Sequence, residues 1–193
     1  ISTTSFFPAK PLGCYGDGGA VFTNNDEWAK IMDSLRVHGK GSFKYDNVRI
    51  GLNSRLDTLQ AAILQVKFEA FKKYEVEDVN KAAAIYTEKL KGIVKTPVIP
   101  KGYYSSWAQY TIQLKDREQR DGLQAYLKEH GIPSMVYYPT PMHGQTAYKE
   151  LNYPADSNPV TQRLCGTVLS LPIHPYITRE DIEKVCEFVA SYV

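Results

Sequence analysis

Cysteine is scarce in this chain, and metal-binding side chains are not grouped along it. The cysteines are Cys14, Cys165 and Cys186, an odd number without a CxxC pair, and the four histidines are dispersed. A disulfide framework needs paired cysteines, and a structural zinc site needs closely spaced Cys or His ligands. The sequence therefore argues against both and favours a reducing compartment, the cytosol.

Long apolar runs and strong net charge are lacking as well. No hydrophobic stretch approaches the roughly 20 residues that cross a membrane, and no signal peptide is recognisable. The net charge is +2, with Lys and Arg scattered along the chain. Because a nucleic-acid surface normally shows as a basic cluster, we expect neither a nucleic acid nor a membrane as a partner.

The amino-acid composition is typical of a globular protein. The 193 residues are 43% hydrophobic and 23% charged, which is sufficient for one large or two small domains. The chain opens at Ile1 rather than at a methionine, inside the strand-like segment ISTTSFF. This opening leads us to expect a fragment or a proteolytic product.

Hydrophobic spacing predicts an alternation of helices and strands. Apolar steps of three and four residues predict one helix from Leu56 through Phe71 and a second that ends at Gly92. Asn24–Asp26, Asp116 and Thr178 are predicted to start three further helices. The complete expectation is buried strands at 1–7 and 18–23, a helix to about 37, a loop at 39–53, strands at 108–114, 134–138 and 168–171, and helices at 117–130, 158–165 and from 179 onward.

The most informative segment is SFFPAKPLGCYGDGG, residues 5–19. Lys10 lies between prolines and ahead of four glycines. A charged ammonium is a poor nucleophile, and apolar neighbours such as Phe6 and Phe7 disfavour the charged form. This setting suits an amine that condenses with an aldehyde, and a plain turn is the alternative. The glycines match neither GxxxxGK[ST] nor GxGxxG, which argues against a nucleotide P-loop and a Rossmann turn.

Five collinear segments carry a family resemblance: SFFPAKPLGCYGDGGAVFTN, RVHGKG, RIGLNSRLDTLQAAIL, VYYPTPMHGQ and LSLPIHPYIT. In order and spacing they resemble the DegT/DnrJ/EryC1/StrS family of pyridoxal 5'-phosphate (PLP)-dependent sugar aminotransferases. The resemblance implies an α/β chain that forms the C-terminal half of a fold type I PLP-dependent transferase. It implies the end of the large PLP-binding domain at 1–55, connecting helices at 56–95 and a small α/β domain at 96–193.

The resemblance also implies which residues bind the cofactor. Lys10 would be the catalytic residue that binds the PLP aldehyde covalently, and Ser5 would hydrogen-bond the PLP phosphate. Asn53 would reach the phosphate of a partner subunit, which implies a homodimer with a shared active site. From the residues alone, Ser5 could instead be satisfied within its strand, and Asn53 or Ser54 could cap the helix that follows.

The substrate residues implied by the resemblance are Arg55, Tyr137 and Tyr138. Arg55 matches an arginine that binds an acidic sugar nucleotide, and a planar guanidinium suits a carboxylate. Related sequences often carry His-Tyr-Pro where this chain has Tyr137-Tyr138-Pro, so Tyr137 departs from the pattern. A solvated arginine and two packing tyrosines are the alternatives. His38 and His143 lie in family motifs with their roles left open.

The implied reaction moves an amino group from an amino acid, glutamate, to a keto sugar nucleotide in the cytoplasm. The motifs suggest the branch that acts on a UDP-3-keto-N-acetylhexosaminuronate in lipopolysaccharide O-antigen or related polysaccharide synthesis. A 4-keto-6-deoxy sugar substrate stays open, as does a non-catalytic oligomerisation module. A sugar dehydratase is disfavoured, because that branch replaces the lysine by histidine. The aspartate that pairs with the pyridine nitrogen is not located in this sequence, so we expect the chain alone to be inactive.

Overall fold

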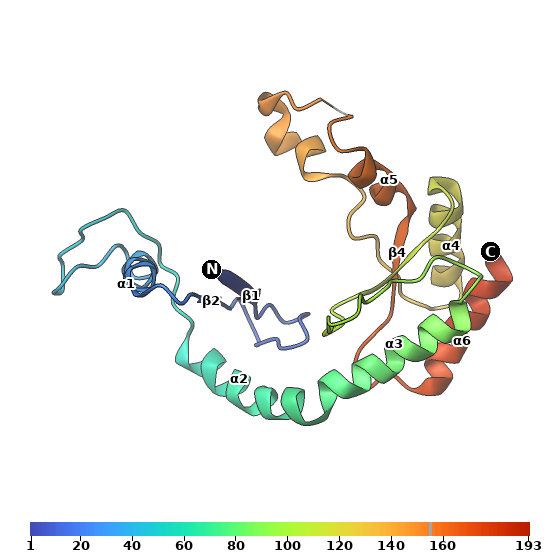
Figure 1. Ribbon diagram of the computed structural model, residues 1–193, viewed down its shortest axis with the longest axis horizontal. Coiled ribbons are helices and arrows are strands. Elements are labelled where there is room, and N and C mark those ends of the chain that lie inside the picture. The colour runs from blue at the N-terminus through green and yellow to red at the C-terminus, as the bar shows by residue number, and fades with distance from the viewer. Residues whose placement is uncertain (155) are drawn as a thin grey trace. The chain divides into compact units, whose positions relative to one another are not determined.

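The computed structural model describes residues 1–154 and 156–193, which divide into two compact units, Ile1–Lys73 and Tyr74–Val193. Each unit mixes helices with a two-stranded antiparallel sheet (Figure 1). A π-helical segment, Phe71–Glu75, follows the last helix of unit 1 and precedes the first helix of unit 2. The α/β character predicted from the sequence is confirmed.

Unit 1 begins with strands β1 (Ser2–Ser5) and β2 (Gly19–Phe22), which pair from Ser2 opposite Phe22 to Ser5 opposite Gly19. The helix α1 (Asp26–Leu35) follows, and its N-cap Asn25 accepts a hydrogen bond from the Trp28 amide at 3.0 Å. The helix α2 (Thr58–Ala70) comes after a long loop. The strands were predicted to be buried, but their residues are exposed or half-buried, because within unit 1 no layer covers the sheet on both faces.

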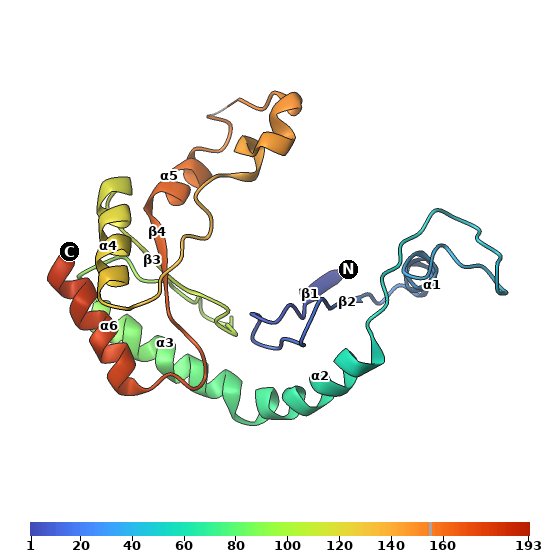
Figure 2. The same cartoon turned by 180° about the vertical axis from the view of Figure 1, so that it is seen from behind.

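Unit 2 is built around one hydrophobic core. Its helices are α3 (Val76–Leu90), α4 (Arg117–Glu129), α5 (Pro159–Thr167) and α6 (Arg179–Tyr192), and its strands are β3 (Tyr110–Gln113) and β4 (Val168–Leu171). Helices α3 and α6 lie side by side, as both views show (Figures 1 and 2). Two short 3-10 turns, Met142–Gly144 and Thr146–Leu151, lie between α4 and α5.

Aromatic side chains fill the centre of this core. The rings of Tyr86 and Tyr110 stack with centroids 4.9 Å apart, and the Tyr86 hydroxyl donates to the Pro172 carbonyl at 2.8 Å. Burial raises the pKa of Tyr110 to about 12. Trp107 packs against Tyr110, and its indole N–H donates to Asn80 Oδ1 at 2.9 Å. The core thus joins α3 to both strands.

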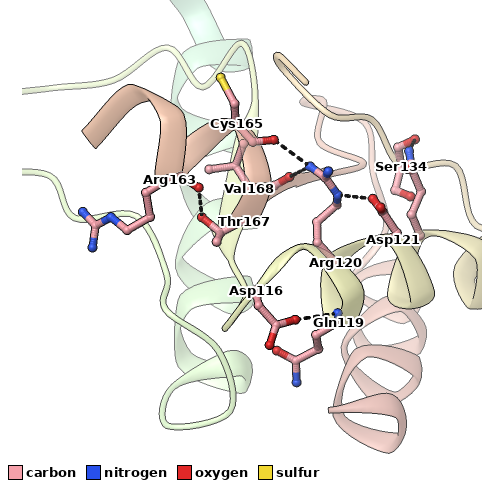
Figure 3. Close-up of polar contacts among 10 residues, drawn as sticks. Asp116, Gln119, Arg120, Asp121, Ser134, Arg163, Cys165, Thr167 and Val168 are labelled. Carbon is pink, nitrogen blue, oxygen red and sulfur yellow. Dashed lines mark hydrogen bonds and ion pairs between the residues drawn. The ribbon is translucent and has the colours of Figure 1, made fainter. Parts of the chain in front are cut away.

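A buried arginine connects α4 to α5 and β4. Arg120 is 2% exposed, and its guanidinium donates to the carbonyls of Cys165 at 3.2 Å and Val168 at 3.3 Å. Its Nε also donates to Asp121 at 2.5 Å (Figure 3). The buried charge is therefore compensated on more than one side, as a desolvated guanidinium requires.

One predicted strand is wrong. Residues 134–138 form no strand; Met135 alone bridges Ser170 of β4. Pro133 and Pro139 flank this segment and lack the N–H that a strand ladder uses, so pairing does not extend in either direction. The helices and the other strands are found where they were expected, with ends shifted by a few residues.

Candidate functional site

The loop that carries Lys10 connects β1 to β2 and is closed by main-chain hydrogen bonds. The Phe6 amide donates to the Gly18 carbonyl at 2.8 Å, and the Cys14 amide donates back to the Phe6 carbonyl at 2.8 Å. Lys10 lies between these closures, and its own amide donates to the Phe7 carbonyl at 2.8 Å. The lysine is therefore presented on a closed loop rather than on a free segment.

Two of the glycines are required by close approach. A Cβ on Gly13 would lie 2.6 Å from the Pro8 carbonyl oxygen, and one on Gly18 would lie 2.9 Å from Cys14 Sγ. Real Cβ atoms do not approach other heavy atoms so closely, so a side chain at either position would force the backbone apart. The glycines thus serve the compact folding of this loop.

The Lys10 side chain is exposed, and so is that of its neighbour Phe7, at 52%. The expectation that apolar neighbours bury the amine is wrong for this chain: Phe6 is half-buried and Phe7 exposed, and the loop does not enclose Lys10. Ser5 is exposed too, and its Oγ accepts a hydrogen bond from the Phe7 amide at 3.2 Å. The Ser5 hydroxyl proton stays available for a bond to another acceptor.

Asn53 and Arg55 lie together in unit 1. Both are exposed, and Arg55 Nη2 donates to Asn53 Oδ1 at 2.9 Å. The neighbouring backbone is fixed beside the end of α1, because the Ser54 amide donates to the Arg36 carbonyl at 2.9 Å. Helix α2 begins at Thr58 with Asp57 at its N-cap position, so neither Asn53 nor Ser54 is the cap.

A groove of about 1150 Å³ lies next to this pair. Residues of β1, β2, α1 and the segment 52–56 line it, and Asn53 and Arg55 are among them. Lys10 and Ser5 do not line this groove. Unit 1 therefore places the predicted cofactor and substrate residues in two local groups, one on the loop 5–10 and one on the segment 53–55.

Tyr137 and Tyr138 belong to unit 2, directly after the Met135 bridge. They are 40% and 66% exposed, and their ring centroids are 5.5 Å apart. Both hydroxyls belong to side chains with free surface, which a packing role alone would not give them. Their predicted contact with substrate stays a prediction.

Three of the four histidines make local hydrogen bonds. His38 has a positive φ of 60° and its amide donates to the Leu52 carbonyl. The His174 ring accepts a hydrogen bond from the Tyr176 amide at 3.2 Å, while His143 Nε2 lies 3.3 Å from Gln162 Nε2. In the described part of the chain, no group of three or more Cys, His, Asp or Glu side chains is arranged to hold a metal ion.

One residue that contacts the lysine loop was not singled out from the sequence. Gln60 of α2 accepts a hydrogen bond from the Tyr15 amide through Oε1 at 2.8 Å. Its signal was its place in the motif GLNSRLDTLQAA, as a polar residue three and four positions before Ile63 and Leu64 of the same helix. None of the helices in the described ranges combines the length and apolar character of a bilayer-spanning segment.

Comparison with known proteins decides the family. The model of the DegT/DnrJ/EryC1/StrS aminotransferase family matches residues 1–190. This chain is a member of that family. The resemblance carried by the five sequence segments is thereby confirmed, and aminotransferases of this family use PLP.

Among curated proteins, the chain is 44% identical over 187 residues to the UDP-2-acetamido-2-deoxy-3-oxo-D-glucuronate aminotransferase of Pseudomonas aeruginosa, covering 96% of this chain and 50% of that protein. It is 43% identical over 195 residues to the pleiotropic regulatory protein of Geobacillus stearothermophilus, covering 99% of this chain and 51% of that protein. The chain thus spans about half the length of these relatives.

Solved structures agree with this assignment. A DegT/DnrJ/EryC1/StrS aminotransferase from Brucella abortus matches 98% of this chain and 50% of its own, with a TM-score of 0.91 and 49% identity. NtdA from Bacillus subtilis, solved with bound cofactor PMP, matches 98% of this chain and 45% of its own, with a TM-score of 0.86 and 29% identity. The chain has the fold of half of a fold type I PLP-dependent transferase, as expected.

Proposed function

We propose that this chain supplies the catalytic lysine of a PLP-dependent sugar-nucleotide aminotransferase. The observation that carries the proposal is Lys10, exposed on a closed loop between β1 and β2, in a chain that belongs to an aminotransferase family. An exposed lysine on a fixed backbone can reach a bound aldehyde.

The residues of this loop fit the proposed cofactor. Lys10 would bind the PLP aldehyde carbon through its Nζ with loss of water, and Ser5 would donate its hydroxyl proton to a phosphate oxygen. PLP supplies an electron sink that stabilises negative charge on the substrate carbon. Once displaced from the cofactor, the free amine of Lys10 would move a proton at that carbon.

The second group, Asn53 and Arg55, suits anions. Because Arg55 occupies Asn53 Oδ1, the Nδ2 group of Asn53 is left to donate to a phosphate oxygen. We propose that Asn53 does so for a partner subunit, in a homodimer with a shared active site. Arg55, with one guanidinium edge still open, would bind the carboxylate of a uronate substrate.

For the substrate we propose a UDP-3-keto-N-acetylhexosaminuronate, with glutamate as the amino donor. The name of the Pseudomonas aeruginosa relative supports this choice, since that protein acts on a UDP-3-oxo-glucuronate derivative. Tyr137 and Tyr138 would contact the sugar nucleotide. This reaction would place the protein in cytoplasmic synthesis of lipopolysaccharide O-antigen or a related surface polysaccharide.

The proposed domains follow from the same assignment. Residues 1–55 would end the large PLP-binding domain, 56–95 would be connecting helices, and 96–193 would form the small domain. The chain matches about half of the length of its relatives, and the aspartate that pairs with the pyridine nitrogen is not located in it. We therefore propose that the 193 residues alone hold PLP poorly and are inactive.

The test joins this chain to the N-terminal half of the Pseudomonas aeruginosa relative and reduces the product with borohydride in the presence of PLP. Peptide mapping is expected to find the pyridoxyl group on Lys10, and the matched variant Lys10→Arg is expected to carry none. Label spread over other lysines, with Lys10 unlabelled, would contradict the proposal. A panel of keto sugar nucleotides, including 4-keto-6-deoxy sugars, then identifies the substrate.

A further inference from the structure

Cys14 is the buried centre of the Lys10 loop. Its side chain is fully buried, at 0% exposure, although nearly all residues around it are exposed or only half-buried. Cys14 Sγ lies 3.0 Å from the Phe6 carbonyl oxygen and 3.1 Å from the Gly16 carbonyl oxygen. The thiol therefore lies between the first residue of the loop and a residue close to its end.

The Phe6 carbonyl receives two contacts from the same residue. It accepts from the Cys14 amide at 2.8 Å and lies within reach of the thiol proton. A carbonyl oxygen has two lone pairs, so it can satisfy both donors. These contacts close the segment from Phe6 to Cys14 into a ring with Lys10 at its far end. Because a thiol is a weak hydrogen-bond donor, the packing of the buried sulfur atom contributes to closing this ring as well as its hydrogen bond.

Helix α2 holds the same loop from outside. The Gln60 side chain accepts from the Tyr15 amide, next to Cys14, and its Nε2 would lie 3.2 Å from a Cβ on Gly16. Leu56 Cδ1 would lie 3.0 Å from a Cβ on Gly18. The segment around Cys14 is therefore fixed on one side by its own thiol and on the other by a helix side chain.

We propose that Cys14 and Gln60 are positioning residues that fix the conformation of the Lys10 loop and thereby the direction of the lysine amine. The catalytic importance of the amine's direction rests on the proposed function, whereas the conformation of the loop does not. Full burial leaves Cys14 no surface from which to act as a nucleophile. Gln60 does not contact Lys10 and acts only through the backbone of residues 14–16.

The test uses the 193-residue chain without cofactor. Hydrogen exchange of the Phe6, Cys14 and Tyr15 amides is measured together with trace acetylation of Lys10 by acetic anhydride, mapped by mass spectrometry. In Cys14→Ala and in Gln60→Ala we expect the loop amides to exchange about fivefold faster, the loss of roughly one hydrogen bond. The relative acetylation of Lys10 is expected to change with them.

Conservative variants separate positioning from general damage. Cys14→Ser keeps a donor of similar size, and Gln60→Glu keeps the acceptor, so both are expected to stay within twofold of the parent chain. Gln65→Ala, an exposed glutamine on the same helix, is the matched control and should leave the loop amides unchanged. Unchanged amides of α1 and of the second half of α2, which belong to the same unit as the loop, verify the fold of unit 1 in each variant.

Two outcomes would overturn the proposal. In one, the Cys14→Ala and Gln60→Ala chains exchange and acetylate like the parent. In the other, Cys14→Ser is as damaging as Cys14→Ala and Gln60→Glu is as damaging as Gln60→Ala. If the loop responds as expected but borohydride leaves no pyridoxyl group on Lys10 in the joined protein, the proposed function fails and the positioning role stands.

Discussion

Cys186 on α6 shows how burial makes a single side chain sensitive to pH. It is 5% exposed in the core of unit 2, and burial raises the pKa of its thiol to about 11. An unfolded chain releases this proton near pH 9. The folded state therefore holds the proton more tightly, and this contribution to stability is present below pH 9 and is lost as the pH rises to about 11.

We predict that Cys186→Ala flattens the dependence of stability on pH between 9 and 11. Urea unfolding of the parent and the variant at several pH values measures this as a difference in the free energy of unfolding. The gap between the two should shrink by an amount on the order of 2 kcal/mol across that window. Besides burial, the thiolate of Cys186 also raises the pKa of Tyr86 and Tyr110, so the comparison is confined to the window between pH 9 and 11, below their titration. A constant gap would contradict the prediction.

Arg120 is the second residue whose substitution has a defined cost. Arg120→Met keeps much of the volume but leaves the carbonyls of Cys165 and Val168 without their donor in a buried place. We predict a loss of about 3 kcal/mol in the free energy of unfolding. Denaturant unfolding measures the loss.

The partner of Arg120 offers the control for that substitution. Asp121 is 57% exposed and faces water, so Asp121→Asn should cost about 1 kcal/mol or less. Equal costs for the two variants would show that the exposed ion pair, not the buried carbonyls, is the stabilising contact.

Sequence patterns predicted the role of a residue better where that role depends on its neighbours along the chain. The lysine loop and its glycines could be predicted from neighbouring residues in the sequence. The exposure of Lys10 could not, because it depends on where the side chains of Phe6 and Phe7 point in space. The bond from Arg55 to Asn53 was likewise missed, since a two-residue spacing in a loop specifies no geometry.

Helix starts are the elements that the sequence specified most sharply. Asn25, Asp116 and Thr178 each accept a hydrogen bond from the amide three residues later, at 2.9–3.1 Å. Their short polar side chains precede apolar periodic segments, which is the pattern that predicted them. The segment 134–138 shows the opposite case, because its pairing depends on a distant strand, with which Met135 alone forms a bridge.

At this scale we predict that Thr178→Ala lowers the stability of the chain by about 1 kcal/mol. The substitution removes the oxygen that satisfies the Asp181 amide at the start of α6. Thr178→Ser keeps the oxygen and is expected to lose no more than a few tenths of that amount. Thermal and urea unfolding give both values, and equal losses in Ala and Ser would exclude capping as the cause.

The two units differ in how much apolar surface they bury. Among the described residues, the buried apolar side chains of unit 1 are Cys14 and Leu64, whereas unit 2 buries a connected cluster that includes Tyr86, Tyr110 and Leu127. Burial of apolar area is the dominant stabilising contribution in a folded domain. Unit 2 therefore contains most of the stability of this chain.

We predict that limited proteolysis of the chain cuts first within residues 1–73. The fragment that resists should begin close to residue 74 and retain α3 through α6, because opening these elements exposes the core. Mass spectrometry of early time points identifies the cuts. Early cleavage inside α3 or α6, with the segment 1–73 intact, would contradict this order.

Family membership was recoverable from the sequence because five segments occur in the right order. The boundary between compact units was not, since Lys73 and Tyr74 fall inside a continuous apolar periodicity with no proline or glycine to mark a break. Contacts between distant parts of the chain, such as the packing of α3 against α6 and the stacking of Tyr86 on Tyr110, assign α3 to unit 2.

The indole of Trp107, hydrogen-bonded to Asn80 and packed on Tyr110, has one counterpart in the chain, the half-exposed Trp28 of α1. Each unit thus carries its own intrinsic fluorophore in a different solvent environment. With excitation that selects tryptophan over tyrosine, a Trp28→Phe chain emits from unit 2 and a Trp107→Phe chain from unit 1, so the melting of each part can be followed optically without any added dye.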